Sequence, residues 1–179
     1  MANEVLVKQD TPIVWANTGD YAGDGGTRTH QIDLTGVVAA EAREGAKADL
    51  GATRASRYAA TLRIEFATAP ADGDTVDLYL GTSLSVTAGT ANPGELTGAD
   101  ADYTGSTGST LAESLLQLDF VGSLICTNDA TALVQQQTFV YSPALQYLIP
   151  VVHDNGADNF HSDAVEMSIT LTPLIDEIQ

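Results

Sequence analysis

Alternation of apolar and polar residues with a period of two constrains the fold of this chain more than any other feature. The alternation is clearest between residues 58 and 67, and it returns between residues 165 and 172, where it ends at Pro173. Such a pattern is typical of strands with one buried face and one exposed face. Both segments are therefore predicted to be strands, the second one ending at the proline.

Further strands are predicted from apolar segments bounded by Gly, Pro, Asn or Asp. The longer ones are Thr75–Leu80, Leu115–Cys126, Ala132–Tyr141 and Gln146–His153, and the shorter ones lie around Val5–Val7, Ile13–Trp15 and His30–Val38.

Two segments also have features that favour a helix. Residues 37–50 are rich in Ala, Glu, Arg and Lys, but Gly45 interrupts them and their apolar residues form no stripe. Residues 110–118 offer Ser109 or Thr110 as an N-cap and Glu113 in a first turn, although the alternation of the following strand extends into them. Helix and strand both stay open for this second segment.

Many short strands without the spacing of parallel units predict an all-β fold, an antiparallel β-sandwich of jelly-roll type. The length of 179 residues fits a single domain. Within it, residues 1–57 are expected to be an extended N-terminal docking region, and residues 81–110 a long irregular loop.

The segment 81–110 is rich in Gly, Thr, Ser, Ala and Asp. Loops of this length are uncommon in compact domains and are usually functional or disordered. An unstructured insertion and an arm that orders against a neighbouring subunit are the alternatives, and the few apolar side chains favour the arm. The predicted inter-subunit contacts are Leu84, Val86, Pro93, Leu96 and Tyr103.

The charge of the chain is divided unevenly along the sequence. The net charge is -17, all seven Lys and Arg lie in residues 1–63, and residues 64–179 hold sixteen Asp and Glu with no Lys or Arg. These carboxylates must be solvated, bound to cations, or paired with the first third or another chain. Neither nucleic acid nor an anionic membrane is expected as a partner. The predicted contacts with an acidic partner are Arg43, Lys47, Arg54 and Arg57.

Two acidic loops contain candidate metal ligands. The first holds Asp72, Asp74 and Asp77 close together, as in oxygen-rich loops that bind Ca²⁺, but it lacks the EF-hand order. The second connects His153 to the region of His161 and offers nitrogen and oxygen donors without a standard zinc spacing. Turns are favoured in both places. No cofactor is expected, and Ca²⁺ is the alternative.

The sequence contains no catalytic signature. There is neither a Gly-x-Ser-x-Gly motif nor a phosphate-binding Gly-rich motif, and the single Cys126 has no partner for an internal disulfide. Aromatic residues make up 6% of the chain, which leaves little for sugar-stacking platforms. The protein is expected not to be an enzyme, and the lack of a signal peptide or long apolar run predicts synthesis in a reducing cytoplasm.

Three parts of the sequence resemble small structural proteins of tailed-phage virions. They are residues 47–58, residues 76–80 with 92–100, and residues 161–179. The similarity lies in the general residue pattern and in the order of the segments. The resemblance implies a virion component, a β-sandwich that decorates or cements the capsid. Because packaged DNA would repel a strongly acidic protein, a position on the outer shell or along the tail is expected. The resemblance also implies a homo-oligomer, a trimer, in contact with the major capsid protein or another virion protein.

Two other functions stay open. A receptor- or glycan-binding virion module would use residues 81–110 or 153–163 as its recognition surface, and a tail or neck structural module is a further possibility in the virion. A Ca²⁺-dependent adhesion or carbohydrate-binding sandwich would use the acidic loops, and Ca²⁺ would then raise its melting temperature.

Overall fold

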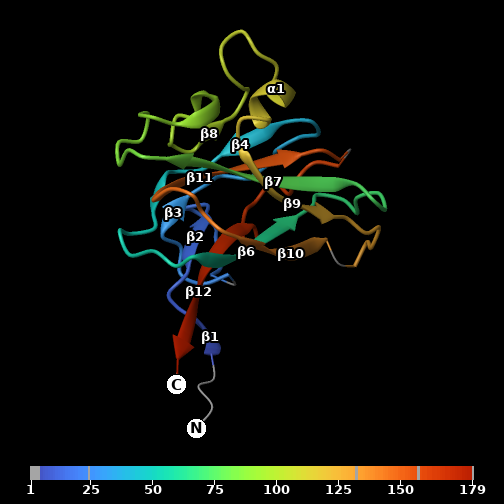
Figure 1. Cartoon of the computed structure of the whole chain (residues 1–179). Helices are drawn as coiled ribbons and strands as arrows, with labels where there is room; N and C mark the ends of the chain where they lie inside the picture. The colour runs from blue at the N-terminus through green and yellow to red at the C-terminus, as the bar shows by residue number, and fades with distance from the viewer. Residues whose placement is uncertain (1–4, 24, 132, 157, 179) are drawn as a thin grey trace.

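The computed structural model describes residues 5–23, 25–131, 133–156 and 158–178, which form two sheets packed against each other (Figure 1). Strands account for 41% of the described residues and helix for 5%, which confirms the all-β prediction. The strands are β1 (Val5–Gln9), β2 (Ile13–Ala16), β3 (His30–Gln31), β4 (Ala42–Glu44), β5 (Ala48–Asp49), β6 (Arg57–Glu65), β7 (Thr75–Ser83), β8 (Ala101–Asp102), β9 (Asp119–Ile125), β10 (Val134–Tyr141), β11 (Tyr147–Asp154) and β12 (Ser168–Ile178). The helical elements are the 3-10 turn η1 (Pro93–Glu95) and the helix α1 (Leu111–Leu115).

The two sheets have different strand orders. Sheet A runs β10-β6-β12-β2-β3, and β1 pairs with the C-terminal half of β12. Sheet B runs β8-β4-β11-β7-β9, and β5 pairs with the start of β11. The pairings among the described strands are antiparallel except for that of β2 with β3. The predicted antiparallel sandwich is thus present at the level of its two sheets.

The main hydrophobic core lies between the sheets. Trp15 of β2 and Leu62 of β6 belong to the same fully buried cluster as Leu78 of β7 and Leu148 of β11. Burial alternates along the whole of β6, as the sequence pattern predicted. The Trp15 indole Nε1 donates a hydrogen bond to the Ala46 backbone oxygen at 2.7 Å, so the largest buried side chain also has its polar atom satisfied.

A second hydrophobic cluster covers the outer face of sheet B. Ile149 and Val151 of β11 lie on the face opposite the main core and are fully buried with Leu96 and Tyr103. These contacts come from residues 84–118, which we call the cover. Because both faces of β11 are buried, its burial is continuous and does not alternate.

Helix α1 within the cover decides the open choice at residues 110–118. The Thr110 hydroxyl accepts a hydrogen bond from the Glu113 backbone N–H at 3.2 Å, and the Glu113 carboxylate accepts one from the Thr110 N–H at 2.8 Å. This capping box satisfies N–H groups that a helix leaves unpaired. The strand predicted for Leu115–Cys126 consequently begins only at Asp119. No helix in the described part of the chain is long and apolar enough to cross a membrane.

Two prolines occur inside strands, each where the neighbouring strand changes. The prediction that the last strand ends at Pro173 is wrong, because β12 continues to Ile178. On one edge β12 pairs with β2 as far as Leu171 and with β1 from Leu174 onward, so Pro173 lies in a gap that needs no N–H donor. Pro150 lies in the same way between the β5 and β4 pairings of β11.

The described part of residues 1–57 does not form the expected extended region. Strands β1 to β5 belong to both sheets, and Trp15 and Ile32 are buried in the main core. Burial of these apolar side chains between the sheets stabilises the fold, and this explains why the segment is folded and not extended. Within the predicted strand His30–Val38, only His30–Gln31 pairs as a strand.

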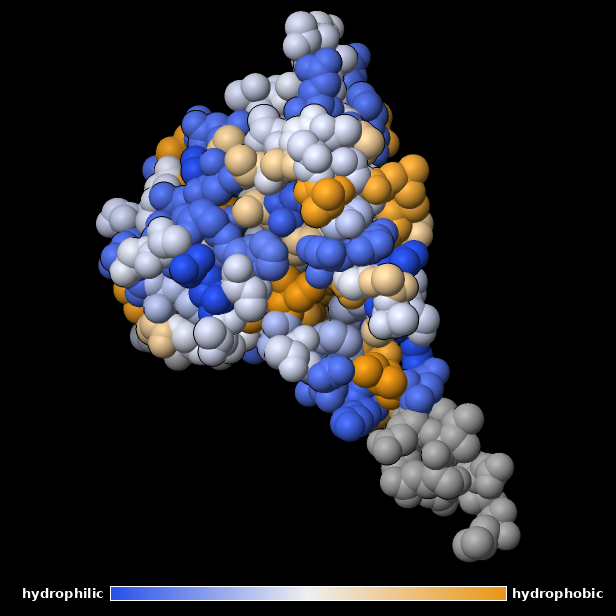
Figure 2. All heavy atoms as spheres, turned by 90° about the vertical axis from the view of Figure 1, so that its left-hand side faces the viewer, coloured by the Kyte–Doolittle hydropathy of each residue, from blue (hydrophilic) through white to orange (hydrophobic). Residues whose placement is uncertain are grey.

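The two ends of the chain form a terminal ribbon, made of β1 and residues 174–178 of β12. It projects from the sandwich in Figure 1 and again in the turned view of Figure 2. The pairing of β12 with β6 stops at Leu174, and beyond it the ribbon has no further partner strand among the described residues. Val7 and Ile175 are 57% and 38% exposed there. A two-stranded ribbon is marginally stable in water, so this element depends on its base or on a partner.

Candidate functional site

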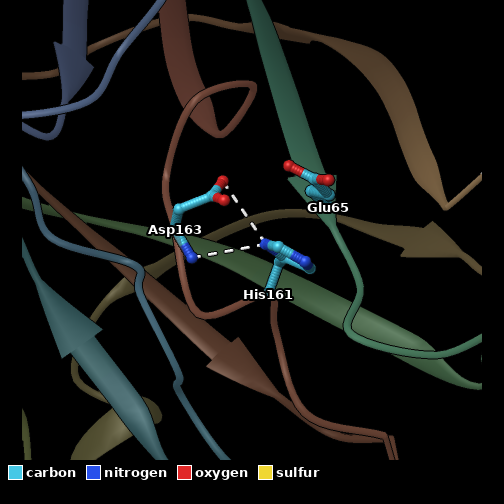
Figure 3. A group of neighbouring side chains, drawn as sticks. All are labelled: Glu65, His161 and Asp163. Atoms are coloured by element: carbon cyan, nitrogen blue, oxygen red, sulfur yellow. Dashed lines mark hydrogen bonds and ion pairs between the residues drawn. The ribbon is translucent and has the colours of Figure 1, made fainter.

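A histidine and two carboxylates from distant parts of the sequence meet at one end of sheet A (Figure 3). Glu65 is the last residue of β6, and His161 and Asp163 lie in the connection from β11 to β12. One potential ligand atom of each lies within 4.8 Å of the others. We call these three residues the triad, and within the described residues it is the only such group of three His, Cys, Asp or Glu side chains.

Packing in the hydrophobic core positions two residues of the triad. Phe66 and Phe160 form an isolated antiparallel bridge, and their buried rings meet edge to face with centroids 5.8 Å apart. Next to this bridge the His161 backbone N–H donates to the Glu65 backbone oxygen at 2.9 Å. The side chains of Glu65 and His161 are therefore brought together by the packing of Phe66 and Phe160, which are their neighbours in the sequence.

The charges around Glu65 are poorly balanced. Its Oε2 atom is shielded from solvent and has no hydrogen-bond partner. Burial raises the pKa of Glu65, the His161 ring opposes that rise, and the nearby carboxylates of Asp163 and Glu166 add to it. Arg63 offsets part of this negative charge, and it is also paired with Glu166 at 3.3 Å. A cation at this position would be stabilised by the surplus negative charge.

The His161 ring makes two long polar contacts, both with Asp163. Its Nδ1 lies 3.3 Å from the Asp163 backbone nitrogen and 3.3 Å from Asp163 Oδ1. The first contact needs an unprotonated Nδ1 and the second a protonated one, and both are longer than most hydrogen bonds. The side chains of His161 and Asp163 are 32% and 48% exposed, so the triad is open to solvent.

The other metal candidates suggested by the sequence lie elsewhere. Asp72 accepts a hydrogen bond from the Asn128 backbone N–H at 2.6 Å, so its Oδ1 already has a partner within the chain. Asp77 accepts one from the Ser123 hydroxyl within sheet B. Among the described residues, the candidates that join no group of three potential ligands are Asp72, Asp74, Asp77 and His153.

Asp154, the last residue of β11, is a fully buried carboxylate. Its Oδ1 accepts a hydrogen bond from the Gly156 N–H at 2.9 Å, whereas its Oδ2 has no partner. Burial raises the pKa of Asp154 to about 6, and the nearby Asp74 and Asp158 contribute to the rise. This carboxyl group therefore exchanges its proton near neutral pH in the folded protein.

Arg43, a predicted docking residue, is engaged within its own chain by two carboxylates. It contacts Asp100 at 2.8 Å and Asp102 at 2.6 Å, and both carboxylates belong to the cover. Asp100 also accepts hydrogen bonds from the Asp33 N–H at 3.0 Å and the Gln31 side chain at 3.2 Å. Arg43 thus links β4 of sheet B to the cover and is not free for an acidic partner, and Asp100 connects the cover to β3 of sheet A.

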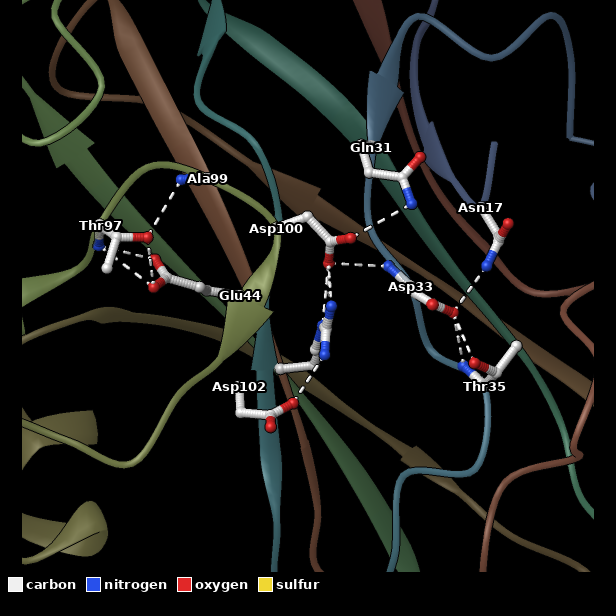
Figure 4. A network of polar contacts seen from close by, with 10 residues as sticks. Asn17, Gln31, Asp33, Thr35, Glu44, Thr97, Ala99, Asp100 and Asp102 are labelled. Carbon is white, nitrogen blue, oxygen red and sulfur yellow. Dashed lines mark hydrogen bonds and ion pairs between the residues drawn. The ribbon is translucent and has the colours of Figure 1, made fainter. Parts of the chain in front are cut away.

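Lys47, the second predicted docking residue, also holds the cover. Its Nζ donates to the Ser83 hydroxyl and to three backbone oxygens between residues 85 and 90, at 2.7 to 3.1 Å. Nearby, the Glu44 carboxylate is 1% exposed and accepts hydrogen bonds from the N–H groups of Thr97 and Gly98 (Figure 4). Lys47 therefore anchors the first half of the segment 83–98, and Glu44 anchors the second half.

The last two predicted docking residues remain nearer the surface, at the base of the terminal ribbon. Arg54 donates to the Ala144 backbone oxygen at 2.9 Å. Arg57 pairs with Asp176 of β12 at 2.7 Å, and these two side chains are 43% and 51% exposed. Arg54 and Asp176 line one open hollow, which places both cations beside the ribbon.

The predicted inter-subunit residues separate into two groups. Leu96 and Tyr103 are 2% and 4% exposed, and their proposed contact with another subunit is wrong because they bury the chain's own sheet B. Pro93 is partly buried at the start of η1. Leu84 and Val86 are 76% and 72% exposed and remain free of the cover's hydrophobic cluster.

Comparison with family models, curated proteins and solved structures finds no match for the chain. The function therefore has to be argued from the fold and its surfaces. For the triad, the sequence pointed to His161 and to the acidic connection that contains Asp163. It did not point to Glu65, because an outward carboxylate at the end of a strand has the ordinary pattern of a solvated residue.

Proposed function

We propose that this protein is a non-enzymatic structural component of a virion, an oligomeric decoration or cement protein on the outer surface of the capsid. The observation that carries the proposal is the terminal ribbon, whose edges beyond Leu174 have no partner strand among the described residues. Open strand edges pair readily with strands of other chains. An element of this shape suits attachment to a neighbouring subunit more than binding of a small molecule.

The charges near the ribbon support a defined orientation. With Arg43 and Lys47 occupied inside the chain, Arg54 and Arg57 are the predicted docking cations that remain beside the ribbon. A ribbon that pairs with a capsid subunit would bring these two cations to an acidic surface of that subunit. The acidic surface away from the ribbon would then face the medium, and its charge would keep it away from packaged nucleic acid.

The proposal includes the jelly-roll type and a homotrimer at local threefold positions of the capsid. The chain crosses between the sheets repeatedly from β5 to β12, which is the kind of connectivity that jelly rolls use. Leu84 and Val86 offer exposed apolar side chains to a second copy of the chain. The partners in this proposal are the chain itself and the major capsid protein or another virion protein, with synthesis in the host cytoplasm.

The experiment that tests the virion role uses particles of the virus whose genome encodes the chain. Mass spectrometry of purified particles should detect the protein at a stoichiometry of three copies per local threefold position, which is one copy per capsid subunit. Immunogold labelling should place it on the outer surface of the head. Its absence from purified particles would overturn the proposal, and labelling confined to the tail would overturn its capsid position.

The docking surface is tested with Arg54→Gln and Arg57→Gln. Each variant should bind stripped particles more weakly than the unchanged protein, and the difference should shrink as salt increases, because screening removes the contribution of the cation. Arg28→Gln removes one positive charge from another loop and serves as the matched control. Equal occupancy of all three variants at low salt would rule out docking through Arg54 and Arg57.

A further inference from the structure

The triad has a donor set that suits a divalent transition metal. It combines one imidazole nitrogen with two carboxylates whose ligand atoms lie within 4.8 Å of one another. Zinc accepts this mixture of His and Asp or Glu ligands, whereas Ca²⁺ prefers a shell of oxygen atoms only. The chemistry of the three side chains therefore favours Zn²⁺ over Ca²⁺.

The surroundings of the triad point to a missing positive charge. Glu65 Oε2 is shielded from solvent without a hydrogen-bond partner, although buried carboxylate oxygens are normally paired. Glu166 lies close enough to act on Glu65 as a further negative charge, and it already shares Arg63. An ion between Glu65 and His161 would satisfy the unpaired oxygen and reduce the repulsion among the carboxylates.

The position of the triad gives such an ion a structural effect. Glu65 ends β6, whereas His161 and Asp163 belong to the connection between β11 of sheet B and β12 of sheet A. In the structure this connection is held to β6 and the residues after it by the Phe66 and Phe160 bridge, by backbone hydrogen bonds on either side of that bridge, and by the ion pair of Arg63 with Glu166. An ion bound to all three side chains would add a link that survives local opening of this bridge.

We propose that Glu65, His161 and Asp163 bind one Zn²⁺ ion, which fastens the connection between the two sheets to β6. Three protein ligands leave a fourth tetrahedral position for water or for the Glu166 carboxylate. The 32% and 48% exposure of His161 and Asp163 gives the ion a path from solvent. This proposal is independent of the virion role, since it concerns a link within one chain.

The test begins with full-length protein treated with EDTA and then dialysed free of the chelator. Zn²⁺ at a hundredfold excess over its Kd should raise Tm by about 5 °C or more, because an ion that binds only the folded state stabilises it. Isothermal titration calorimetry should give one Zn²⁺ per chain. Mn²⁺ should bind more weakly than Zn²⁺, and Ca²⁺ should produce no comparable shift.

Three substitutions assign the ligands. Glu65→Gln, His161→Ala and Asp163→Asn should each weaken Zn²⁺ binding by about tenfold or more, with circular dichroism of the metal-free variants checking that they fold. His30→Gln and Asp20→Asn, which remove an imidazole and an exposed carboxylate elsewhere, should bind Zn²⁺ as the unchanged protein does. The absence of Zn²⁺ binding, equal binding by the triad variants and their controls, or a preference for Ca²⁺ would each overturn the proposal.

Discussion

Sheets A and B bury their strands in different ways. Strand β10 of sheet A keeps one face exposed, and its Val140 is 70% exposed. Strand β11 of sheet B is buried on both faces, since the main core covers one and the cover lies on the other. Polar anchors accompany the cover, with Lys47 and Glu44 holding its backbone. The comparison shows that an alternating pattern survives only where no other part of the chain covers the sheet.

The largest difference between the sheets should appear when an outward apolar side chain is shortened. Ile149→Ala in β11 removes a fully buried side chain beneath the cover and should lower the free energy of unfolding by about 2 to 5 kcal/mol. Val140→Ala in β10 should change it by less than about 0.5 kcal/mol. Urea denaturation of both variants measures the contrast, and equal losses would mean that the cover does not bury sheet B in solution.

The pH dependence of stability should reveal the buried Asp154 at the end of β11. Its pKa is raised from 3.8 to about 6, so the folded state holds the proton more tightly than the unfolded state. Its contribution is fully present below about pH 4 and is lost as pH rises through about 6, with a total of at most about 3 kcal/mol. Asp154→Asn should therefore flatten the fall in unfolding free energy between pH 4 and 7.

Other carboxylates also change their charge in this range, so the Asp154 experiment needs a matched control. Asp20→Asn removes a carboxylate that is exposed in the structure. It should leave the slope between pH 4 and 7 close to that of the unchanged protein. If Asp154→Asn and Asp20→Asn gave the same slope, the burial of Asp154 would not be the source of the pH dependence.

Removing the Lys47 ammonium should loosen the cover with a smaller loss of global stability. Lys47→Met keeps the length of the side chain but removes the donor shared by Ser83 and three backbone oxygens, at a cost of about 1 to 3 kcal/mol. Hydrogen exchange should accelerate in residues 84–98 more than in β6. Lys8→Met, in the exposed strand β1, provides the control, and unchanged exchange in Lys47→Met would contradict the anchoring role.

The smallest effect is expected on the outer face of sheet A. Thr61 of β6 and Thr138 of β10 share a hydrogen bond of 2.8 Å between their exposed hydroxyl groups. Thr61→Val removes it but keeps a β-branched side chain, so the free energy of unfolding should change by less than about 0.5 kcal/mol. A loss above 2 kcal/mol, measured by urea denaturation, would show that this face is buried in solution by another chain.

Much of sheet A could be predicted from the sequence because its strands carry local information. The alternation around Leu62 identifies both the strand and its buried face. For the last strand, however, the sequence pattern predicted an end at Pro173, whereas β12 continues to Ile178. The proline is tolerated because two different strands, β2 and β1, adjoin β12 on either side of it. That arrangement depends on pairing with residues near the other end of the chain, which no local pattern contains.

The candidate sites follow the same division. The acidic connection that contains His161 and Asp163 was recognisable as a source of ligands, but Glu65 joins them only through the packing of Phe66 on Phe160. Similarly, Arg43 and Lys47 looked free for a partner because their acceptors lie 36 to 59 residues further along the chain. The chemistry of a side chain can be read from the sequence. The residue that it contacts depends on how the chain between the two residues folds.

The sequence by itself determined the all-β class, the inward face of strands such as β6, and the separation of a cation-bearing first third from an acidic remainder. These properties depend on periodicity, which is a local feature of the sequence, and on composition, which is a sum over its residues. Only the tertiary structure decided that the predicted arm covers sheet B, that the first-third cations pair with later carboxylates, and that the chain ends form a ribbon. Those contacts join distant residues, and their energies are gained only after the intervening chain has folded.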